Sequence, residues 1–236
     1  MAVATDNIAK YPITDPAAAA DADGRAAIER ALNRAAEALR SATALFVFTG
    51  AGMSVDSGIP DYRGPSEDAQ WGENAELTRL YSKSSQELSE NATWFQEDPE
   101  AAWGCEVRKW LSLISQARPH EGYHIINRWC QRQPHGWFIA TSNVDHQHIR
   151  SGACHHRVYA IHGELFGDPL CKTVVYQCSF DGSDGAGDCS GGLWKVNFDV
   201  LRGAFDPSTG RVKRECLPCC HCCNRPGRPN YLAFKD

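Results

Sequence analysis

The stretch from Ala44 to Gly64 changes abruptly from apolar residues to glycine, and this change most constrains the fold. The β-branched and aromatic run Leu45–Phe48 predicts a strand, and Thr49-Gly50-Ala51-Gly52 follows it without a break. Glycine adopts positive φ angles and carries no Cβ, so such a turn lets backbone N–H groups approach an anion. Two glycines alone fit an ordinary strand–turn–helix junction equally well, because the third glycine of the dinucleotide-binding fingerprint is missing.

The residues on either side of this turn favour a layered α/β domain. Before the strand, apolar residues recur at helical spacing from Ala26 to Leu39, which predicts a helix. After the turn, the loop Ser57–Gly64 combines a proline, an acid, an aromatic residue and an arginine. A helix followed by a strand and a nucleotide-type turn is typical of a parallel sheet with flanking helices.

Composition and charge exclude several classes of function. The chain has 236 residues, of which 42% are hydrophobic and 22% charged, and its formal net charge is −5. Proteins that bind nucleic acid through its phosphates usually carry a basic surface, so we expect no direct nucleic-acid partner. No apolar run is long enough for a membrane span, and the acidic N-terminus lacks a secretion or organelle signal. We therefore expect an intracellular protein, either cytoplasmic or nuclear.

Two segments differ from the rest in composition. Residues 1–22 are polar and alanine-rich, which predicts a flexible N-terminal arm. Residues 67–116 predict a helical insertion that is rich in aromatic side chains, namely Trp71, Trp94, Phe95, Trp103 and Trp110. These aromatic residues are interpreted first as the core of a helical subdomain. The second interpretation is that some of them line a substrate pocket.

The residues from His120 to His124 form the pattern H-E-x-x-H on a predicted helix 120–131. On one helix face, two histidines four residues apart can bind zinc, with the glutamate as general base of a metalloprotease. Pro119 places the motif at a helix start, Gly122 interrupts it, and no third ligand is evident. We therefore interpret the motif as structural, with metalloprotease chemistry as the minor alternative.

Two later strands also end in residue types that carry chemistry. The predicted strand 136–140 runs into Thr141-Ser142-Asn143-Val144-Asp145, and the predicted strand 157–161 presents His162-Gly163. Open α/β sheets bind ligands at the carboxyl ends of their strands. A lone histidine after a strand is nevertheless more often structural than catalytic.

Together these motifs resemble those of the sirtuin (Sir2) family. Residues 50–63 are similar to the family pattern GAGxSxxSGIPDFR, with Tyr62 where phenylalanine is usual. Residues 141–145 resemble TQNID, with Ser142 in place of glutamine, and His162-Gly163 resembles the catalytic HG. This order of motifs makes His162 a catalytic candidate. The resemblance implies an α/β fold with a Rossmann-like parallel sheet, a helical insertion and a small zinc-binding module.

The resemblance also implies an activity: an NAD-dependent protein-lysine deacetylase or deacylase of the acyltransferase class, which releases nicotinamide and O-acyl-ADP-ribose. Its partner would be an acylated-lysine protein, such as a histone or a metabolic enzyme. His162 would be the general base on a ribose hydroxyl, a task that suits an imidazole, and Asn143 would share in catalysis. The implied NAD contacts are Gly50, Ala51 and Gly52 at the pyrophosphate, Asp61, Tyr62 and Arg63 at the nicotinamide end, and Ser142, Asn143, Asp145 and His162 around the ribose and carboxamide.

Eleven cysteines, an odd number, favour a metal site in a reducing compartment over a disulfide framework. The sequence ECLPCCHCC, residues 215–223, offers three C-x₂-C pairs: Cys216/Cys219, Cys219/Cys222 and Cys220/Cys223. The resemblance of residues 228–230 to the family's RPN favours the last pair. Cys178 and Cys189 would then complete a structural zinc site, with a widened loop between them and His221 as the competing ligand. The zinc module would span about 171–228 of a catalytic domain 23–236.

The last residues depart from the family pattern. A strand is predicted at 231–234, and it is followed by Lys235-Asp236, where sirtuins carry glycine and continue. The family's GTS motif and its following strands have no counterpart, so we expect a C-terminally incomplete domain. This leaves two alternatives to a deacylase: a catalytically silent binding module, and an ADP-ribosyltransferase or NAD hydrolase on the same fold.

Overall fold

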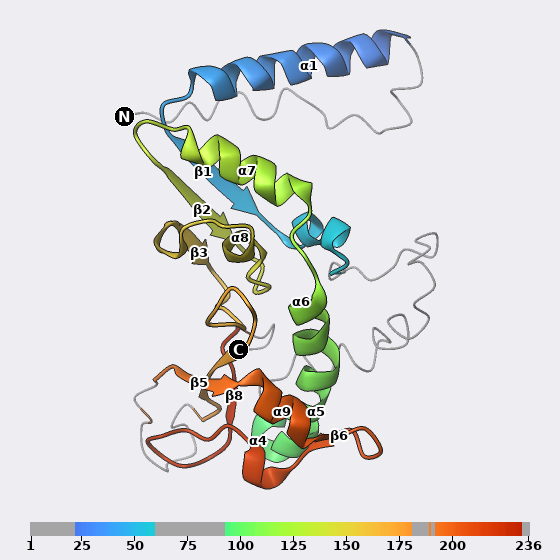
Figure 1. Ribbon diagram of the computed structural model, residues 1–236, viewed down its shortest axis with the longest axis vertical. Coiled ribbons are helices and arrows are strands. Elements are labelled where there is room, and N and C mark those ends of the chain that lie inside the picture. The colour runs from blue at the N-terminus through green and yellow to red at the C-terminus, as the bar shows by residue number, and fades with distance from the viewer. Residues whose placement is uncertain (1–21, 60–92, 181–188, 190–191, 233–236) are drawn as a thin grey trace.

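The computed structural model describes residues 22–59, 93–180, 189 and 192–232. These residues form two lobes, one above the other in Figure 1. The upper lobe holds a parallel sheet with helices, and the lower lobe holds an antiparallel sheet packed among further helices. Among the described residues, we find no helix with the length and hydropathy that a membrane span requires.

The upper sheet consists of β1 (Leu45–Thr49), β2 (Trp137–Thr141) and β3 (Val158–Ala160), in the order β1-β2-β3. Both pairings are parallel, and Thr49 lies beside Thr141, which in turn lies beside Ala160. All three strands therefore end at one edge of the sheet. The predicted parallel sheet flanked by helices is confirmed, and the three strands predicted for it agree with their observed spans to within about one residue. Of the strand predicted at 231–234, Tyr231 forms an isolated bridge with Gly163, and residues 233–234 lie outside the described residues.

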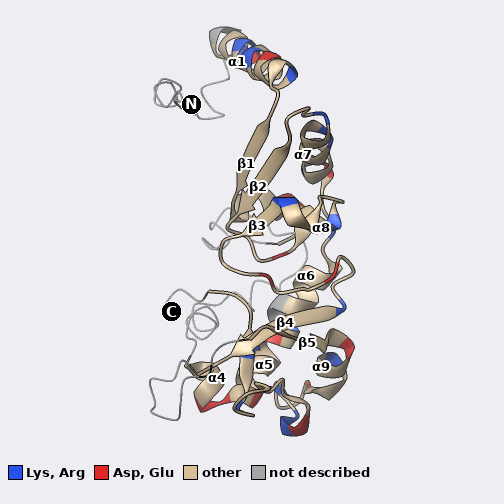
Figure 2. Ribbon diagram, turned by 90° about the vertical axis from the view of Figure 1, so that its left-hand side faces the viewer, with Lys and Arg blue, Asp and Glu red and all other residues tan. Residues whose placement is uncertain are grey.

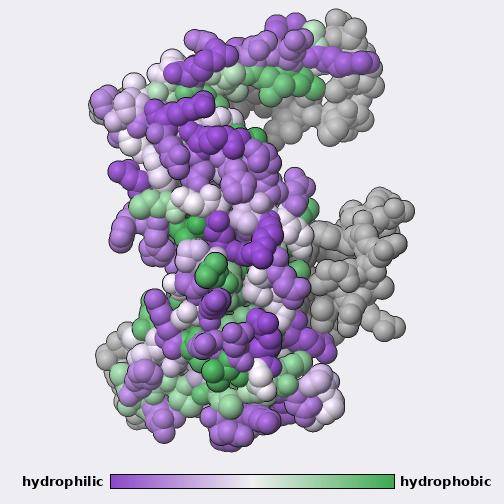
Figure 3. All heavy atoms as spheres, viewed as in Figure 1, coloured by the Kyte–Doolittle hydropathy of each residue, from purple (hydrophilic) through white to green (hydrophobic). Residues whose placement is uncertain are grey.

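Three helices accompany this sheet: α1 (Ala22–Ser41), α7 (Glu121–Gln131) and α8 (Gln147–Arg150). Ile139 of β2 packs one face of the sheet against α7, where it is fully buried beside Cys130. Leu45, Val47 and Ile126 surround this small core. Hydrophilic residues cover the outer side of α7 (Figure 3), so this helix is amphipathic with its apolar side toward the strands.

The lower lobe is built around β4 (Thr173–Cys178), which pairs antiparallel with both β5 (Trp194–Asn197) and β8 (Gly227–Pro229). After β5 come α9 (Phe198–Ala204) and the short hairpin β6 (Phe205–Asp206) and β7 (Arg211–Val212). The helices α4 (Trp94–Glu97), α5 (Pro99–Glu106) and α6 (Ser112–Gln116) complete the lobe, with a π-helical turn, Val107–Leu111, between the last two.

The helices of residues 94–116 and the strands of the predicted zinc module share one core. Phe95 and Trp103 are buried in it together with Phe166 and Phe198. The Trp103 indole Nε1–H donates to the carbonyl of Gly227 in β8, 2.8 Å away. The core interpretation thus applies to Phe95 and Trp103, and Trp94 is partly buried against the same core. Trp71 and the side chain of Trp110 lie outside the described residues.

A close approach between α5 and the β6–β7 hairpin requires a glycine. A Cβ at Gly104 would lie 2.0 Å from the carbonyl oxygen of Gly210, which is too near for any side chain. Beside this contact, the Arg211 guanidinium donates to the carboxylates of Asp98 and Glu100. The helical segment and the hairpin are therefore fixed to each other by packing and by charge.

Candidate active site and metal centre

The turn after β1 leads directly into a short 3₁₀ helix, Ala51–Ser57 (η3). Gly50 precedes this helix with an extended backbone, and Gly58 ends it at φ 83°, a left-handed conformation that favours glycine. A Cβ at Gly50 would lie 3.3 Å from the Ser142 hydroxyl, whereas one at Gly52 would meet no atom of the described residues within 4 Å. The turn therefore packs closely against the end of β2 on one side and is open on the other.

Asn143 is held in one orientation by the turn. Its side-chain Nδ2 donates 2.9 Å hydrogen bonds to the Gly50 carbonyl and to the Ser54 hydroxyl, and its backbone N–H donates to the Thr141 hydroxyl. Because a side-chain amide has only two N–H donors, both are occupied. The carbonyl Oδ1 is then the part of this amide that is left to accept a hydrogen bond from a ligand.

A buried serine, Ser54, sits at the centre of this arrangement and was not among the predicted site residues. Its hydroxyl donates to Asp145 Oδ2 and also contacts the Tyr123 hydroxyl at 2.8 Å. Since the serine proton goes to the carboxylate, Tyr123 and Asn143 must be the donors to Ser54 Oγ. The sequence signal for Ser54 was available, because it is the serine of the GAGxS pattern.

Asp145 is a buried acid whose oxygens are used inside the protein. Oδ2 accepts from Ser54, and Oδ1 accepts from the backbone N–H of Gln147 at the start of α8. Burial raises the pKa of this carboxyl, while the hydrogen bonds from Ser54 and Gln147 act in the opposite direction. Burial likewise raises the pKa of Tyr123, so the phenol stays protonated and donates. Asp145 therefore contacts the Asn143 amide indirectly, through the Ser54 hydroxyl.

A second buried chain of hydrogen bonds joins the strand ends to α8. Thr49 Oγ1 donates to Thr141 Oγ1 at 2.9 Å, and His148 Nε2 lies 2.8 Å from Thr49 Oγ1. Because the threonine proton is used, His148 donates from Nε2. The Tyr123 ring packs against His148 with the ring centroids 4.8 Å apart. Burial lowers the pKa of His148 to about 4.

The low pKa of His148 predicts a loss of stability in acid. The unfolded imidazole titrates near pH 6.5, so the stabilisation from the buried neutral ring is complete above that pH and is lost as the pH falls toward 4. At about 1.4 kcal/mol per pH unit, the difference in unfolding free energy between the wild type and His148→Asn should shrink by ~3 kcal/mol. Denaturant unfolding at pH 7 and pH 4 measures this. His135→Asn is the control, because His135 is exposed. If the difference in unfolding free energy between the wild type and His135→Asn falls by the same amount from pH 7 to pH 4, the interpretation is wrong.

The third strand end carries His162, which is exposed. The backbone N–H of Ile161 donates to the Thr141 carbonyl, and the His162 carbonyl accepts from the N–H of Leu232. Gly163 follows at φ 91°, and a Cβ there would meet the Asn230 carbonyl oxygen at 2.4 Å. The sheet thus places His162 beside the end of β2. Asp61, Tyr62 and Arg63 lie outside the described residues.

The H-E-x-x-H motif does not form a metal site. His120 caps the N-terminus of α7: its Nδ1 accepts from the backbone N–H of Gly122, and its Nε2 donates to the Met53 carbonyl at 2.7 Å. Glu121 is exposed and pairs with Arg128. Both ring nitrogens of His120 are engaged, so the structural interpretation is supported and metalloprotease chemistry has no basis in this geometry.

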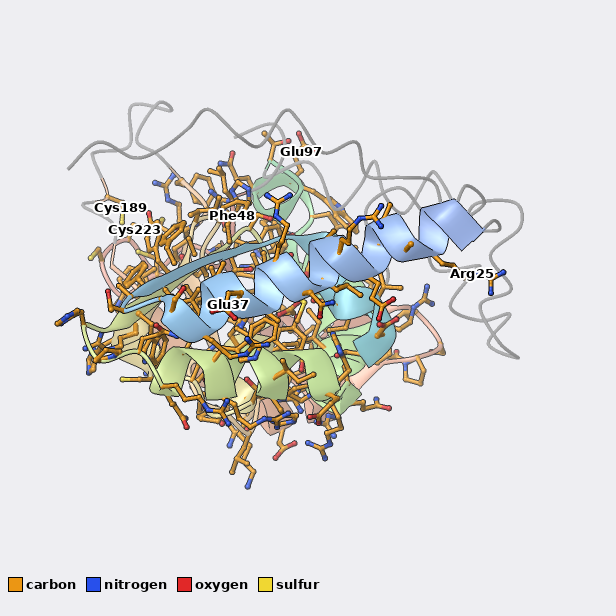
Figure 4. The ribbon with its side chains drawn as sticks, turned by 90° about the horizontal axis from the view of Figure 1, so that it is seen from above. Arg25, Glu37, Phe48, Glu97, Cys189 and Cys223 are labelled. Carbon is orange, nitrogen blue, oxygen red and sulfur yellow. The ribbon has the colours of Figure 1, made fainter. Side chains whose placement is uncertain are left out.

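The lower lobe gathers four sulfur atoms. The thiols of Cys178, Cys189, Cys220 and Cys223 all lie within 4.8 Å of one another, and they are the one group of potential metal-ligating atoms found among the described residues. Cys178 ends β4, and Cys220 and Cys223 lie in the turn before β8 (Figure 4 labels Cys189 and Cys223). This is the ligand set that the RPN resemblance implied. Cys216, Cys219, Cys222 and His221 lie outside it.

The donor set fits zinc. Zinc bound by four thiolates has Zn–S bonds of about 2.3 Å, which places neighbouring sulfurs about 3.8 Å apart. The Cys178–Cys223 sulfur separation is 3.7 Å and the Cys189–Cys220 separation is 3.1 Å. Burial opposes ionisation of Cys223, but hydrogen bonds from Arg225 prevail and lower its pKa to about 6, and the pKa of Cys220 is also lowered, against burial, by backbone hydrogen bonds. Burial raises the pKa of Cys178, and a hydrogen bond with Cys220 raises that of Cys189. Four protein sulfurs leave no open position, so such a metal would be structural.

Comparison with known proteins identifies the family. Residues 50–184, more than half of the chain, match the Sir2 family, and the protein therefore belongs to it. "NAD-dependent protein deacylase 2" of Corynebacterium efficiens is 29% identical over 209 residues, covering 88% of this chain and 67% of that protein. "NAD-dependent protein deacylase" of Pseudomonas putida is 35% identical over 136 residues, 57% of this chain and 45% of that protein. The chain thus spans between about half and two thirds of these relatives.

Solved sirtuins share the fold. A structure described as Sir2 with a p53 peptide and NAD⁺ has a TM-score of 0.55 and 21% identity, covering 87% of this chain and 65% of its own. Sir2Tm bound to a propionylated peptide has a TM-score of 0.54 and 19% identity, covering 87% of this chain and 64% of its own. At this identity the likeness supports the fold alone, which agrees with the sheet and the group of four cysteines described above.

Proposed function

We propose that this chain is an NAD-dependent protein-lysine deacylase, acting on acetyl-lysine or a related acyl-lysine in a protein substrate. The observation that carries the proposal is the meeting of three strand ends at one sheet edge. There the Gly50–Gly52 turn, the oriented Asn143 amide and the exposed His162 follow β1, β2 and β3. The names of the curated relatives and membership of the Sir2 family support the same chemistry.

Each part of the edge has a proposed task. Gly50, Ala51 and Gly52 would bind the pyrophosphate of NAD, since a turn without side chains lets backbone N–H groups approach an anion. Asn143 would accept a hydrogen bond from the ribose or carboxamide through Oδ1, and Ser142 lies beside it. Asp145 would hold Ser54 and thereby the Asn143 amide in place. Bound NAD would supply the glycosidic bond that is cleaved.

His162 would take the proton from a ribose hydroxyl as general base. Its side chain is exposed at the sheet edge, and Gly163 and Leu232 fix its backbone through the contacts described above. Asp61, Tyr62 and Arg63 remain proposed for the nicotinamide end on the family pattern alone. The four cysteines would bind a structural zinc ion that joins the end of β4 to the turn before β8.

The domain interpretation stays a proposal. It comprises an arm at 1–22 and a catalytic domain at 23–236, with the helical insertion and the zinc module joined by the shared core. All eleven cysteines are free of disulfides, which supports an intracellular, reducing location, cytoplasmic or nuclear.

The test is nicotinamide release from NAD by the purified chain, with and without an acetyl-lysine peptide. We expect release that requires the peptide and falls at least about 100-fold in His162→Ala. His156→Ala is a matched control, because this exposed histidine precedes β3 and should leave the rate unchanged. Release without peptide would instead indicate an NAD hydrolase or ADP-ribosyltransferase. A folded, zinc-loaded chain that releases none would overturn the proposal in favour of a binding module.

A further inference from the structure

The two cysteine pairs of the proposed zinc site differ in how well the chain prepares them for a metal. Cys220 and Cys223 are separated by two residues, the usual spacing of a zinc-binding pair. Cys178 and Cys189 are separated by ten residues, so the loop between them costs more conformational entropy to close. Contacts that hold the first pair against the second would therefore strengthen metal binding.

The turn that carries Cys220 and Cys223 is folded by its own backbone. The N–H of Cys220 donates to the Arg225 carbonyl, and the N–H of Asn224 donates to the Cys220 carbonyl, both at 2.8 Å. Asn224 has a left-handed backbone with φ 56°, a conformation that asparagine tolerates. The N–H of Cys222 donates to the sulfur of Cys220 at 3.4 Å. The turn therefore places Arg225 at a fixed position directly after the second cysteine pair.

Arg225 contacts both halves of the site. Its guanidinium and its backbone N–H donate hydrogen bonds to Cys223. Cζ of the same guanidinium lies 3.7 Å from the centroid of the Phe180 ring. Phe180 follows Cys178 by two residues, and its backbone N–H donates to the Cys178 sulfur at 3.5 Å. One side chain thus links a cysteine of the second pair to the segment that holds a cysteine of the first.

The surroundings of these contacts suit a cation. Both halves of the site belong to the lower lobe, which Figure 2 shows with β4 and β5 among α4, α5 and α9. Arg225, Phe180 and the sulfur-bearing residues Cys178 and Cys223 are all partly buried. Charges in partly buried places are costly unless an opposite charge lies beside them. Four thiolates around a divalent ion leave an excess of negative charge, which a neighbouring guanidinium offsets.

Arginine also suits both contacts at once. The guanidinium is charged at every pH at which the protein is folded, and its planar form allows it to stack on a ring while its N–H groups donate hydrogen bonds. The face of an aromatic ring attracts a cation, and this attraction is stronger where water is partly excluded. Phe180 therefore favours the position of Arg225 that reaches Cys223.

We propose that Arg225 holds the zinc site closed by donating to Cys223 while it stacks on Phe180, next to Cys178. The side chain does not bind the metal itself. Each sulfur must leave the metal before zinc is released, and Arg225 restrains the sulfur of Cys223 and joins the two cysteine pairs. The inference rests on the proposed zinc site and does not depend on the proposed deacylase chemistry.

The test is the transfer of zinc from the loaded full chain to a chromogenic pyridylazo chelator, whose colour reports the release rate. We expect Arg225→Gln to release zinc about tenfold faster than the wild type, as expected when a partner of a metal ligand is removed. Arg214→Gln is the matched control, because this exposed arginine lies near Cys219 but pairs with Glu100. An equal acceleration in Arg214→Gln, or none in Arg225→Gln, would overturn the proposal.

A double-mutant cycle tests the stacking of Arg225 on Phe180. Phe180→Leu keeps an apolar side chain but removes the ring face, and we expect zinc release about threefold faster than in the wild type. The double variant should release zinc little faster than Arg225→Gln, because residues in contact have non-additive effects. Independent effects would instead multiply to about thirtyfold, and that result would overturn the proposed stacking.

Metal content and Co²⁺ binding separate a failure of the zinc site from a failure of this proposal. A wild type that holds no zinc would overturn both, whereas a zinc-loaded wild type with unchanged release in Arg225→Gln would overturn the role of Arg225 alone. Co²⁺ bound by four thiolates in place of zinc absorbs visible light. We expect Arg225→Gln to keep this absorption, which verifies its fold, and to bind Co²⁺ about tenfold more weakly. Equal Co²⁺ affinity in the two proteins would contradict the proposal.

Discussion

Replacing Cys220 with alanine is expected to release the zinc ion and to loosen the lower lobe. Cys220 is 1% exposed, and its sulfur lies 3.1 Å from that of Cys189. Three remaining thiols bind zinc far more weakly, and the binding energy of a structural zinc ion is folding energy. Zinc should fall from about one ion per chain to less than about a tenth after dialysis against a weak chelator.

The same variant should become sensitive to proteolysis between β4 and β8. The metal would join Cys178, at the end of β4, to the turn that holds Cys220 and Cys223, and β8 pairs with β4 directly after that turn. Cys222→Ala and Cys105→Ala are the matched controls, and both should retain zinc and protease resistance. Retention of zinc by Cys220→Ala, or an equal loss in Cys219→Ala, would assign the site to another cysteine register.

The sequence predicted this ligand set only with the help of a motif outside the cluster. Cys216, Cys219 and Cys222 have the same two-residue spacing as Cys220 and Cys223, so spacing alone left three registers open. The structure selects one because Cys220 and Cys223 lie opposite the end of β4, across the pairing of Cys178 with Gly227. The antiparallel register of β4 and β8 therefore determines which cysteines meet, and a local sequence pattern does not reveal this register.

The strands were predictable for a local reason. Apolar runs such as Leu45–Phe48, ending in glycine or in small polar residues, have the alternation and the boundaries of strands, and the observed strand Leu45–Thr49 agrees. The helix at His120 was also predictable, but the role of the histidine was not. Its Nε2 donates to Met53, which is 67 residues away in the sequence.

The buried network at the site was the least predictable part. Ser54 meets Tyr123, Asn143 and Asp145, which come from two other segments, and each contact spans more than 60 residues of chain. Similarly, the aromatic insertion and the zinc module were expected as separate units, yet Trp103 of α5 donates to Gly227 of β8. Sequence patterns indicate which residues are buried, but they do not show which buried residues meet.

The second large effect is expected at Asn143, in the peptide-dependent nicotinamide release described above. Asn143→Ala removes the Oδ1 acceptor that the turn and Ser54 hold in place, and misplacement of one positioning group can lower a rate by about 100-fold. We expect kcat to fall by at least that factor. The variant should keep its zinc and its fold, because Asn143 follows β2 of the upper sheet, whereas the four cysteines lie at the end of β4 and in the segments that precede β5 and β8.

Ser54→Ala separates orientation from direct contact. This change retains the Asn143 amide group but frees one of its two N–H donors, and it leaves Asp145 Oδ2 and the Tyr123 hydroxyl without their shared partner. We expect kcat to fall by about tenfold, between the wild type and Asn143→Ala, because the amide then samples more than one orientation. Ser57→Ala is the matched control, since Ser57 belongs to the same short helix but bonds only to the backbone N–H of His120 in the described part of the chain. A folded Ser54→Ala with unchanged kcat would show that the network stabilises the fold without orienting Asn143.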